Sequence, residues 1–207
     1  MSDLYLASRS PRRRELLRQI GVRFESLLLR LSPPRVPDVD ETPHADETAA
    51  GYVARIATAK ARFGVEVLGM RQLPQRPVLA ADTVVVIDGE ILGKPADRDA
   101  AAAFLGRLAG RTHEVRTFVA LASGPAPRFD LFTAESVSKV RFAPLTGRQI
   151  ERYCASGEPF DKAGGYAIQG LAATFVEHLD GSYSGVMGLP LCETAQLLRQ
   201  AGIAELP

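Results

Sequence analysis

Residues 4–17 read LYLASRSPRRRELL and predict a short strand that turns directly into a helix. The first four residues are apolar and suit a buried strand. Ser10 is a favoured N-cap residue, and Pro11 fits the first position of a helix. Leu16 and Leu17 then begin the apolar stripe of a helix that packs on a core. Because strands and helices alternate along the chain, some of them joined by hairpins, the sequence predicts an α/β protein with a mixed twisted sheet flanked by helices.

The turn inside this stretch, residues 8–13, concentrates hydroxyl groups and positive charge. A strand that runs into a capped helix directs free backbone N–H groups and the positive end of the helix dipole at whatever lies in the turn. Arginine adds paired donors that suit phosphate. The alternative is a solvated basic surface, but a cation in the first turn opposes the dipole by about 0.3–1 kcal/mol. The turn therefore favours a polyphosphate site formed by Ser8, Ser10, Arg12 and Arg13.

The other elements follow from apolar periodicity and from turn residues. A proline-rich, acidic segment over residues 32–48 is expected to be a long loop. No linker or internal repeat divides the chain, so we expect a single domain over residues 1–207. Helices are expected over residues 48–63, 97–110, 146–157 and 189–201. Strands are expected over residues 78–81 and 83–87, with an interruption or change of direction at Asp82, and over residues 90–92, 115–122, 136–142 and 174–179.

Composition excludes several classes of protein. The formal net charge is +1 over 207 residues, which is too little for a protein that binds nucleic acid by overall charge. No apolar run approaches the roughly 20 residues that span a bilayer, and the N-terminus lacks the basic and apolar regions of a secretory signal. We expect a soluble cytoplasmic protein with neither a membrane nor a nucleic acid as partner. Cys154 and Cys192 are expected to be ordinary core thiols.

Asp82 lies between two apolar runs. A carboxylate in such surroundings either accepts hydrogen bonds in a turn, as a structural group, or lies at the end of a strand and faces a cavity. Partial burial would raise its pKa toward the range of a general base, or the carboxylate could hold a divalent cation. Asp40 or Glu41 in the acidic loop could supply a second oxygen ligand. Lys60 falls on the apolar face of a predicted helix, where an amine must extend to water, pair with a carboxylate or face a cleft.

Two glycine-containing segments offer further polar groups. The GKP turn around Lys94 lacks the spacing and the hydroxyl residue of a P-loop, but a lysine on a rigid turn suits a phosphate contact. In residues 157–170 the glycines permit close backbone approach, while Asp161, Lys162 and Gln169 offer acid, base and amide groups; a mobile loop is the alternative. The chain has no Gly-x-Ser-x-Gly elbow and no credible cysteine–histidine pair, so covalent catalysis is the weaker hypothesis.

Taken in order, these segments resemble the Maf family of nucleoside triphosphate pyrophosphatases. The resemblance extends from residue 4 to about residue 198 and so covers nearly the whole chain. The matching stretches are LYLASRSPRRRELL (4–17), Asp40-Glu41, Arg55 to Ala61, AADTVVVIDGEILGKP (80–95), GRTHEV (110–115), GEPFDKAGGYAIQG (157–170) and DGSYSGVMGLPLCETAQLL (180–198).

The resemblance implies a fold of two lobes around a deep cleft, a divalent metal cofactor (Mg²⁺ or Mn²⁺) and a possible homodimer. It also implies hydrolysis of a nucleoside triphosphate between its α and β phosphates. Asp82 matches the acid that the family uses as proton acceptor, and Glu41 would join it as a metal ligand. The turn with Ser8, Ser10, Arg12 and Arg13 matches the phosphate-binding turn, and Lys60 and Lys94 match polar positions that line the cleft.

Residues 161–170 look like the branch of the family that acts on dTTP and UTP. In that branch Arg12, Thr83 and Gln169 match the positions linked to the choice of base. A glutamine amide can both donate and accept, so it can pair with a pyrimidine edge that carries one N–H and two carbonyls. Three alternatives remain open: a nucleotide- or nucleic-acid-binding regulator without turnover, a 7-methyl-GTP pyrophosphatase, and a phosphatase or phosphotransferase acting on the γ-phosphate.

Overall fold

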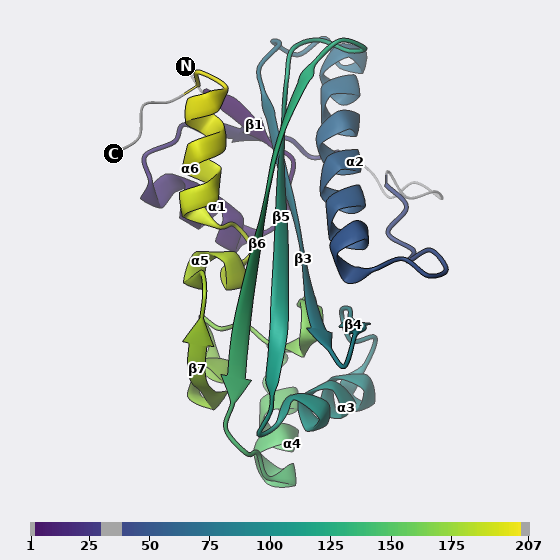
Figure 1. The fold of residues 1–207 in the computed structure, drawn as a ribbon, viewed down its shortest axis with the longest axis vertical. Helices are drawn as coiled ribbons and strands as arrows, with labels where there is room; N and C mark the ends of the chain where they lie inside the picture. Colours follow the sequence, from purple (N-terminus) through teal and green to yellow (C-terminus); the bar gives the residue numbers. More distant parts are fainter. Residues whose placement is uncertain (1–2, 30–38, 204–207) are drawn as a thin grey trace. The chain divides into compact units, whose positions relative to one another are not determined.

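The computed structural model describes residues 3–29 and 39–203. Residues 32–38 of the predicted loop lie outside these ranges, and residues 39–48 contain neither helix nor strand. Figure 1 shows the order of the elements. The strands are β1 (Leu4–Leu6), β2 (Phe24–Ser26), β3 (Val78–Ile87), β4 (Glu90–Leu92), β5 (Thr112–Ser123), β6 (Asp130–Phe142) and β7 (Val176–Asp180). The helices are α1 (Pro11–Gln19), α2 (Ala49–Met70), α3 (Arg98–Leu108), α4 (Gly147–Ala155), α5 (Tyr183–Met187) and α6 (Leu191–Gln200), with two short 3₁₀ helices, η1 (Ala163–Gly165) and η2 (Leu171–Phe175).

Within the described residues, seven strands form one sheet in the order β2-β1-β3-β5-β6-β7, and β4 pairs with β3. Strand β1 pairs in parallel with both neighbours, so that Leu6 lies opposite Ser26 on one side and Leu79 on the other. Strand β3 is antiparallel to β4, and β6 is antiparallel to β7. The sheet is therefore mixed, and the predicted α/β fold class is confirmed.

Four of the helices, α1 to α4, begin at a residue whose side chain caps the helix. In each case the cap side chain accepts a hydrogen bond from the backbone N–H three residues further on, an arrangement that stabilises a helix by about 1 kcal/mol. At α4 the cap is reciprocal, because the Gln149 side chain in turn accepts from the backbone N–H of the cap residue. The capping residues are Ser10 for α1, Thr48 for α2, Asp97 for α3 and Thr146 for α4.

The chain divides into two compact units. Unit 1 consists of residues 1–82, 118–135 and 188–207, and unit 2 of residues 83–117 and 136–187. Strands β3, β5 and β6 contribute residues to both. We describe each unit by itself, and the single domain expected from the sequence stays a prediction.

Unit 1 packs helix α2 against strands β1 and β3 (Figure 1). Its core contains Ala57 and Ala61 of α2 together with Tyr5 of β1 and Val78 of β3. The approach is close, because a Cβ added at Gly64 would lie 2.6 Å from Val78 Cγ1. Helix and strand are therefore in contact where only a glycine fits.

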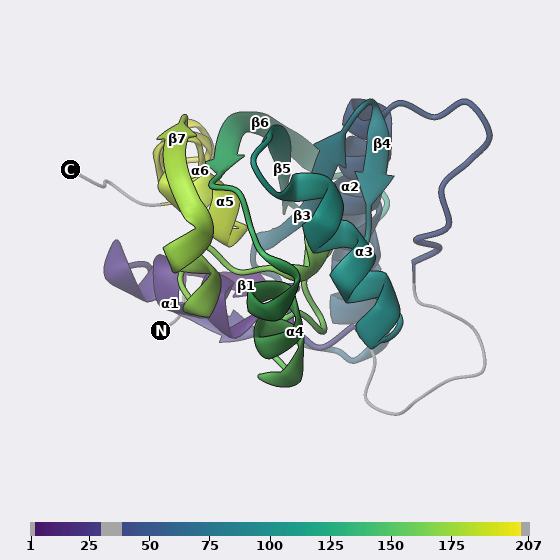
Figure 2. The ribbon, with the colours of Figure 1, turned by 90° about the horizontal axis from the view of Figure 1, so that it is seen from below.

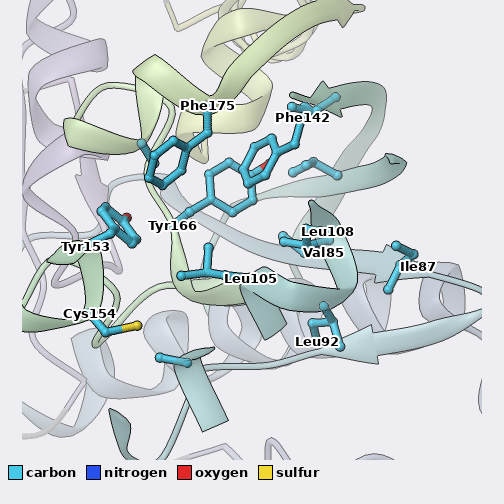
Figure 3. Close-up of a cluster of buried hydrophobic side chains, with 14 residues drawn as sticks. Val85, Ile87, Leu92, Leu105, Leu108, Phe142, Tyr153, Cys154, Tyr166 and Phe175 are labelled. Atoms are coloured by element: carbon cyan, nitrogen blue, oxygen red, sulfur yellow. The ribbon is translucent and has the colours of Figure 1, made fainter. Parts of the chain in front are cut away.

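Unit 2 has a core built around aromatic rings (Figure 3). The Phe142 ring packs edge-on against Tyr166, with 4.8 Å between the ring centroids, and against His113 at 5.1 Å. Phe175 also packs against Phe142 and against Tyr153. Edge-to-face pairs of this kind each contribute about 0.5–1.5 kcal/mol beyond the area that they bury. Helices α3 and α4 lie side by side in this unit (Figures 1 and 2).

Some element bounds differ from the predicted ones. Helix α2 ends at Met70 rather than at residue 63, because Gly64 packs on β3 instead of ending the helix. Strand β3 is continuous, so the predicted interruption at Asp82 is wrong; the Asp82 carboxylate has a charged partner and does not break the strand. Strand β7 begins at Val176, because the preceding residues form η2.

Strands β5 and β6 are longer than expected, and β2, α5 and both 3₁₀ helices were not predicted. Strand β2 and helix α5 are too short for a periodic pattern to show. Cys154 is a buried thiol as predicted, but Cys192 is exposed in the first turn of α6, so that prediction is wrong. Among the described residues, no helix combines the length and the apolar character needed to cross a bilayer.

Candidate functional site

Lys60 connects two carboxylates in unit 1. Its Nζ lies 2.9 Å from Asp82 Oδ1 and 2.6 Å from Glu41 Oε1. The side chains of Lys60 and Asp82 are 18% and 16% exposed, whereas Glu41 is 49% exposed. An ion pair with this little contact to water is screened less than a surface pair. The sequence left three outcomes open for Lys60, and it pairs with carboxylates.

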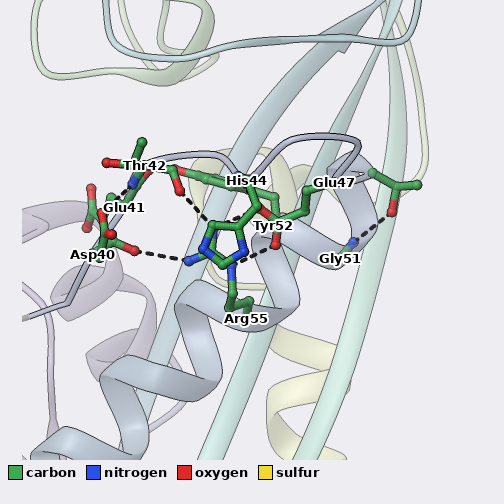
Figure 4. Close-up of polar contacts among 9 residues, drawn as sticks. Asp40, Glu41, Thr42, His44, Glu47, Gly51, Tyr52 and Arg55 are labelled. Atoms are coloured by element: carbon green, nitrogen blue, oxygen red, sulfur yellow. Dashed lines mark hydrogen bonds and ion pairs between the residues drawn. The ribbon is translucent and has the colours of Figure 1, made fainter.

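Helix α2 holds the segment that carries Glu41 (Figure 4). Arg55 donates from Nη1 to the Asp40 backbone oxygen at 3.1 Å and from Nη2 to the Thr42 backbone oxygen at 3.0 Å. The Tyr52 hydroxyl donates to the Glu41 backbone oxygen at 2.9 Å. Three consecutive carbonyl groups are thus bound to two side chains of one helix, and Glu41 is brought to Lys60 from a segment without regular structure.

A paired carboxylate orients Arg55 for this task. Glu47 accepts from Arg55 Nε and Nη2, each at 2.7 Å, in the two-point geometry that suits guanidinium and carboxylate. These hydrogen bonds lower the pKa of Glu47 to about 2. Burial, with smaller contributions from the charges of Asp82 and Glu41, raises the pKa of Tyr52 to about 12, so its hydroxyl stays protonated and can donate.

The arginine-rich turn at the start of α1 has a defined geometry. Ser10 caps the helix, and the Ser8 hydroxyl oxygen accepts from the Ser10 backbone N–H at 3.2 Å and from Arg13 Nη1 at 3.4 Å. Arg13 Nε donates to the Gly188 backbone oxygen at 2.7 Å. The first turn of α1 contains no acidic residue, and Arg12 lies there half-buried. Basic side chains and the positive end of the helix therefore meet without a local counter-charge in that turn.

Arg13 lies in the electrostatic field of the carboxylates. Burial lowers the pKa of Arg13, and the charges of Asp82 and Glu41 act against that shift. The helix turn and the Lys60 cluster are thus neighbours within unit 1. The sequence-predicted residues that unit 1 brings into this neighbourhood are Ser8, Ser10, Arg12, Arg13, Glu41, Lys60 and Asp82.

The two carboxylates also fit a divalent metal ion. Oxygens of Glu41 and Asp82 converge on one point, which Lys60 Nζ occupies here. Among the described residues there is no group of three or more His, Cys, Asp or Glu side chains suited to a metal. A pair of carboxylates is the donor set typical of Mg²⁺ that keeps several waters and binds together with substrate phosphate, rather than of a closed protein cage.

The other predicted site residues belong to unit 2. The hydroxyl groups of Thr83 and Thr117 are 2.9 Å apart. Lys162 Nζ donates to the Glu158 backbone oxygen at 2.7 Å and to Asp161 Oδ1 at 2.8 Å, so this pair closes its own turn. Three of these predicted site residues are exposed to solvent: Lys94, Asp161 and Gln169.

Four functional candidates were given no role from the sequence: Tyr52, Arg55, Thr117 and Glu158. Glu158 fixes the segment around Gln169, because its carboxylate accepts from the Tyr153 hydroxyl at 2.9 Å and from the Leu171 backbone N–H at 2.8 Å. One signal alone pointed to Arg55 and Glu158: each is a polar residue inside a segment already expected to be functional. The partners of Thr117 come from strands and helices far apart in sequence, so no local pattern could have indicated it.

Comparison with known proteins finds relatives that match nearly the whole chain. A family model described as "Maf-like protein" matches residues 3–201. The dTTP/UTP pyrophosphatase of Aromatoleum aromaticum is 54% identical over 200 residues, which cover 96% of this chain and 95% of that one. The proteins of the same name from Bordetella avium and Dechloromonas aromatica are 54% and 50% identical, over 97% and 98% of this chain and 96% and 99% of theirs.

Among solved structures, the Ham1 protein of Staphylococcus aureus matches with a TM-score of 0.41 and 16% identity, over 66% of this chain and 71% of that one, and we base no conclusion on that likeness. The family assignment rests on the family model and on the curated relatives, each of which spans nearly the whole chain. With matches of this extent, the chain belongs to the Maf family.

Proposed function

We propose that this protein hydrolyses dTTP and UTP between the α and β phosphates, releasing the nucleoside monophosphate and pyrophosphate. Membership of the Maf family and the name of its relatives, dTTP/UTP pyrophosphatase, support this activity. The observation that carries it is the Lys60 ammonium held between Glu41 and Asp82, in the same electrostatic neighbourhood as Arg13 at the start of α1. Groups that bind phosphate and a group that can take a proton are thus present together.

The turn at α1 would hold the phosphates. Backbone N–H groups at the start of a helix and arginine side chains are the donors that phosphate oxygens accept best. Arg13 is oriented by its bond to the Gly188 carbonyl, so little ordering is left to be done when substrate binds. Lys60 and Arg12 add positive charge that offsets the charge of the leaving pyrophosphate.

Asp82 would act as the general base. Its Oδ1 binds a cation, here the Lys60 ammonium, and this contact fixes the orientation of the carboxylate. Oδ2 would then orient a water molecule and take its proton while the water oxygen attacks phosphorus. The bond from phosphorus to the bridging oxygen breaks, and pyrophosphate leaves with that oxygen.

We also propose that Glu41 and Asp82 hold a divalent cation, Mg²⁺ or Mn²⁺, together with the triphosphate. Such an ion supplies positive charge that neutralises phosphate oxygens as the reaction proceeds. The converging pair of carboxylates supports this assignment, and the ion would take the place between them that Lys60 Nζ has here.

In unit 2 we propose that Thr83 and Gln169 contact the base. The Glu158 carboxylate binds the backbone beside Gln169, which supports a defined place for that amide. We retain the prediction that Arg12 contributes to base choice. We also retain the prediction that the substrate is bound by Lys94, Asp161 and Lys162. The homodimer is also kept as a prediction, which light scattering of the purified protein would test.

The test is incubation with UTP and Mg²⁺ followed by separation of pyrophosphate from orthophosphate. We expect pyrophosphate and UMP in equal amounts, no orthophosphate, and loss of turnover when the metal is chelated. Orthophosphate would indicate attack at the γ-phosphate, and binding without product would indicate a regulator. Parallel reactions with dTTP, CTP and 7-methyl-GTP would separate the proposed specificity from the other branch of the family.

A further inference from the structure

A row of hydrogen-bonded oxygens in unit 2 runs from Thr83 through Thr117 to Gly185. The two threonine hydroxyl oxygens are 2.9 Å apart, and Thr117 Oγ1 lies 2.8 Å from the Gly185 backbone oxygen. Thr117 is 1% exposed, so water does not compete for its hydroxyl. Gly185 is itself held, because its backbone N–H donates to Ser182 Oγ at 3.0 Å.

The chemistry of the end of this row fixes its direction. A carbonyl oxygen only accepts, and a threonine hydroxyl has a single proton. The proton of Thr117 therefore points to Gly185, and in the bond between the threonines Thr83 must be the donor. Any further hydrogen bond at Thr83 Oγ1 has to be one that this oxygen accepts.

A hydroxyl group that can only accept a hydrogen bond can discriminate between pyrimidine bases. Uracil and thymine carry one donor on the base edge, N3–H, whereas N3 of cytosine is an acceptor. The Gln169 amide can present either its oxygen or its nitrogen, so it suits O4 of uracil or the amino group of cytosine equally well. The direction of the Thr83 hydroxyl is fixed. Of the two groups, Thr83 is therefore the one that cannot adapt to either base.

From this we infer that Thr117 is a positioning residue for base choice: it fixes the Thr83 hydroxyl as an acceptor for N3–H of uracil or thymine and against N3 of cytosine. The inference rests on the proposed function, because it takes Thr83 to face the base of a bound triphosphate. It deepens that function by assigning the selection to a buried residue that does not touch the substrate.

The test compares UTP and CTP as substrates of Thr117→Val. Valine keeps the shape of threonine but can neither accept from Thr83 nor donate to Gly185. The Thr83 hydroxyl can then turn and donate to N3 of cytosine. We expect the ratio of kcat/KM for UTP to that for CTP to fall by about tenfold, the cost of facing two acceptors. Thr117→Ser restores a hydroxyl at the same place and should keep the ratio of the unchanged protein.

Thr194→Val is the matched control. Thr194 is 0% exposed, and its hydroxyl has no hydrogen-bond partner among the described residues, so the same substitution there removes no directed bond. This variant should keep the ratio. The double variant Thr83→Val, Thr117→Val should give the same ratio as Thr83→Val alone, because Thr117 acts through Thr83.

The outcomes separate the two proposals. If the unchanged protein and Thr194→Val prefer UTP and Thr117→Val retains that preference, the inference is overturned and the proposed function stands. If no variant releases pyrophosphate from UTP or dTTP, the proposed function fails and the inference with it. Should Thr117→Val not fold, Thr83→Val decides: an unchanged ratio there overturns the inference, and a fall of about tenfold or more supports it.

Discussion

The polar groups of unit 1 and those of unit 2 are stabilised in different ways. In unit 1 the groups that matter are charged and meet opposite charges, as Lys60 does with Glu41 and Asp82. In unit 2 the buried ones meet uncharged partners, as Thr117 does with a backbone carbonyl and His113 does with the Tyr166 hydroxyl at 2.7 Å, whereas Lys162 forms an ion pair with the exposed Asp161. Charges can neutralise a phosphate and exchange partners when it binds, whereas the hydrogen bonds of Thr117 have a fixed direction, because one of them ends on a carbonyl oxygen. The charged contacts therefore suit the proposed chemistry, and the contacts of Thr117 suit the proposed selection of the base.

The largest effect should come from removing a charge from unit 1. Asp82→Asn takes away the proposed base, and turnover of UTP should fall by about 10³-fold. The fold should persist, because asparagine has the same shape and can still face Lys60. Pyrophosphate release measures turnover, and circular dichroism checks the fold. Asp130→Asn, at an exposed position of the same unit, is the matched control, and full activity of Asp82→Asn would refute the base assignment.

Low pH should destabilise unit 2 through His113, a buried side chain that is neutral in the folded protein. Burial lowers the pKa of His113 to about 4, below the value of about 6.5 expected in the unfolded chain. The unfolded chain then takes up a proton that the folded chain refuses, so stability is complete above pH 6.5 and is lost as pH falls from there toward 4. The loss should reach about 3 kcal/mol.

Urea unfolding at a series of pH values measures this effect. His113→Phe removes the titrating group and keeps an aromatic ring in the cluster with Phe142 and Tyr166. The variant should be less stable at neutral pH, because the Tyr166 hydroxyl loses its partner, but its stability should depend less on pH between 4 and 6.5. An equal slope in both proteins would assign the acid loss to other groups.

A smaller effect is expected from a methyl group in unit 2. A Cβ at Gly170 would overlap the Glu158 carboxylate, which must then give up its bonds to Tyr153 and Leu171. Gly170→Ala should lower the free energy of unfolding by about 2 kcal/mol. Gly106→Ala has open space around it in helix α3, and alanine is the better helix former there, so this control should be slightly stabilising. Chemical unfolding curves of the two variants should shift in opposite directions.

The smallest effect should come from the scaffold of the charged site. Lysine at position 55 keeps the charge but has a single nitrogen, which cannot bind two carbonyls and Glu47 together. Arg55→Lys should lower kcat/KM for UTP by about tenfold, because Glu41 is then held less firmly. Arg62→Lys, on an exposed position of the same helix, should leave kcat/KM unchanged. Equal values for the two variants would show that Arg55 does not position Glu41.

Much of the local structure could be predicted, because its causes are local. Ser10 and Thr146 cap helices that start where the sequence placed them, and Asp88-Gly89 forms the predicted turn between β3 and β4 with positive φ at both residues. Helix α2 was predicted too short, since the packing of Gly64 on Val78 comes from a distant strand.

The candidate site divides in the same way. The arginine turn carries its own signal, because positive charge in the first turn of a helix is unfavourable unless an anion offsets it. The pairing of Lys60 with both Asp82 and Glu41 joins residues up to 41 positions apart, so the sequence could only offer it as one of three outcomes for Lys60. The direction of the Thr117 hydroxyl depends on a carbonyl 68 positions away and leaves no trace in any local pattern.

One feature of unit 1 bears on how this protein can change over generations. Arg55 and Tyr52 bind residues 40–42 through main-chain oxygens, which every amino acid provides. The Asp40 carboxylate also accepts from the Thr42 backbone N–H at 2.9 Å, so substitutions at Asp40 should cost that bond but keep the contacts with the helix, while Glu41, whose own side chain pairs with Lys60, should accept almost no substitution. Substitutions on either side of Glu41 would therefore leave the backbone contacts of this segment with helix α2 intact.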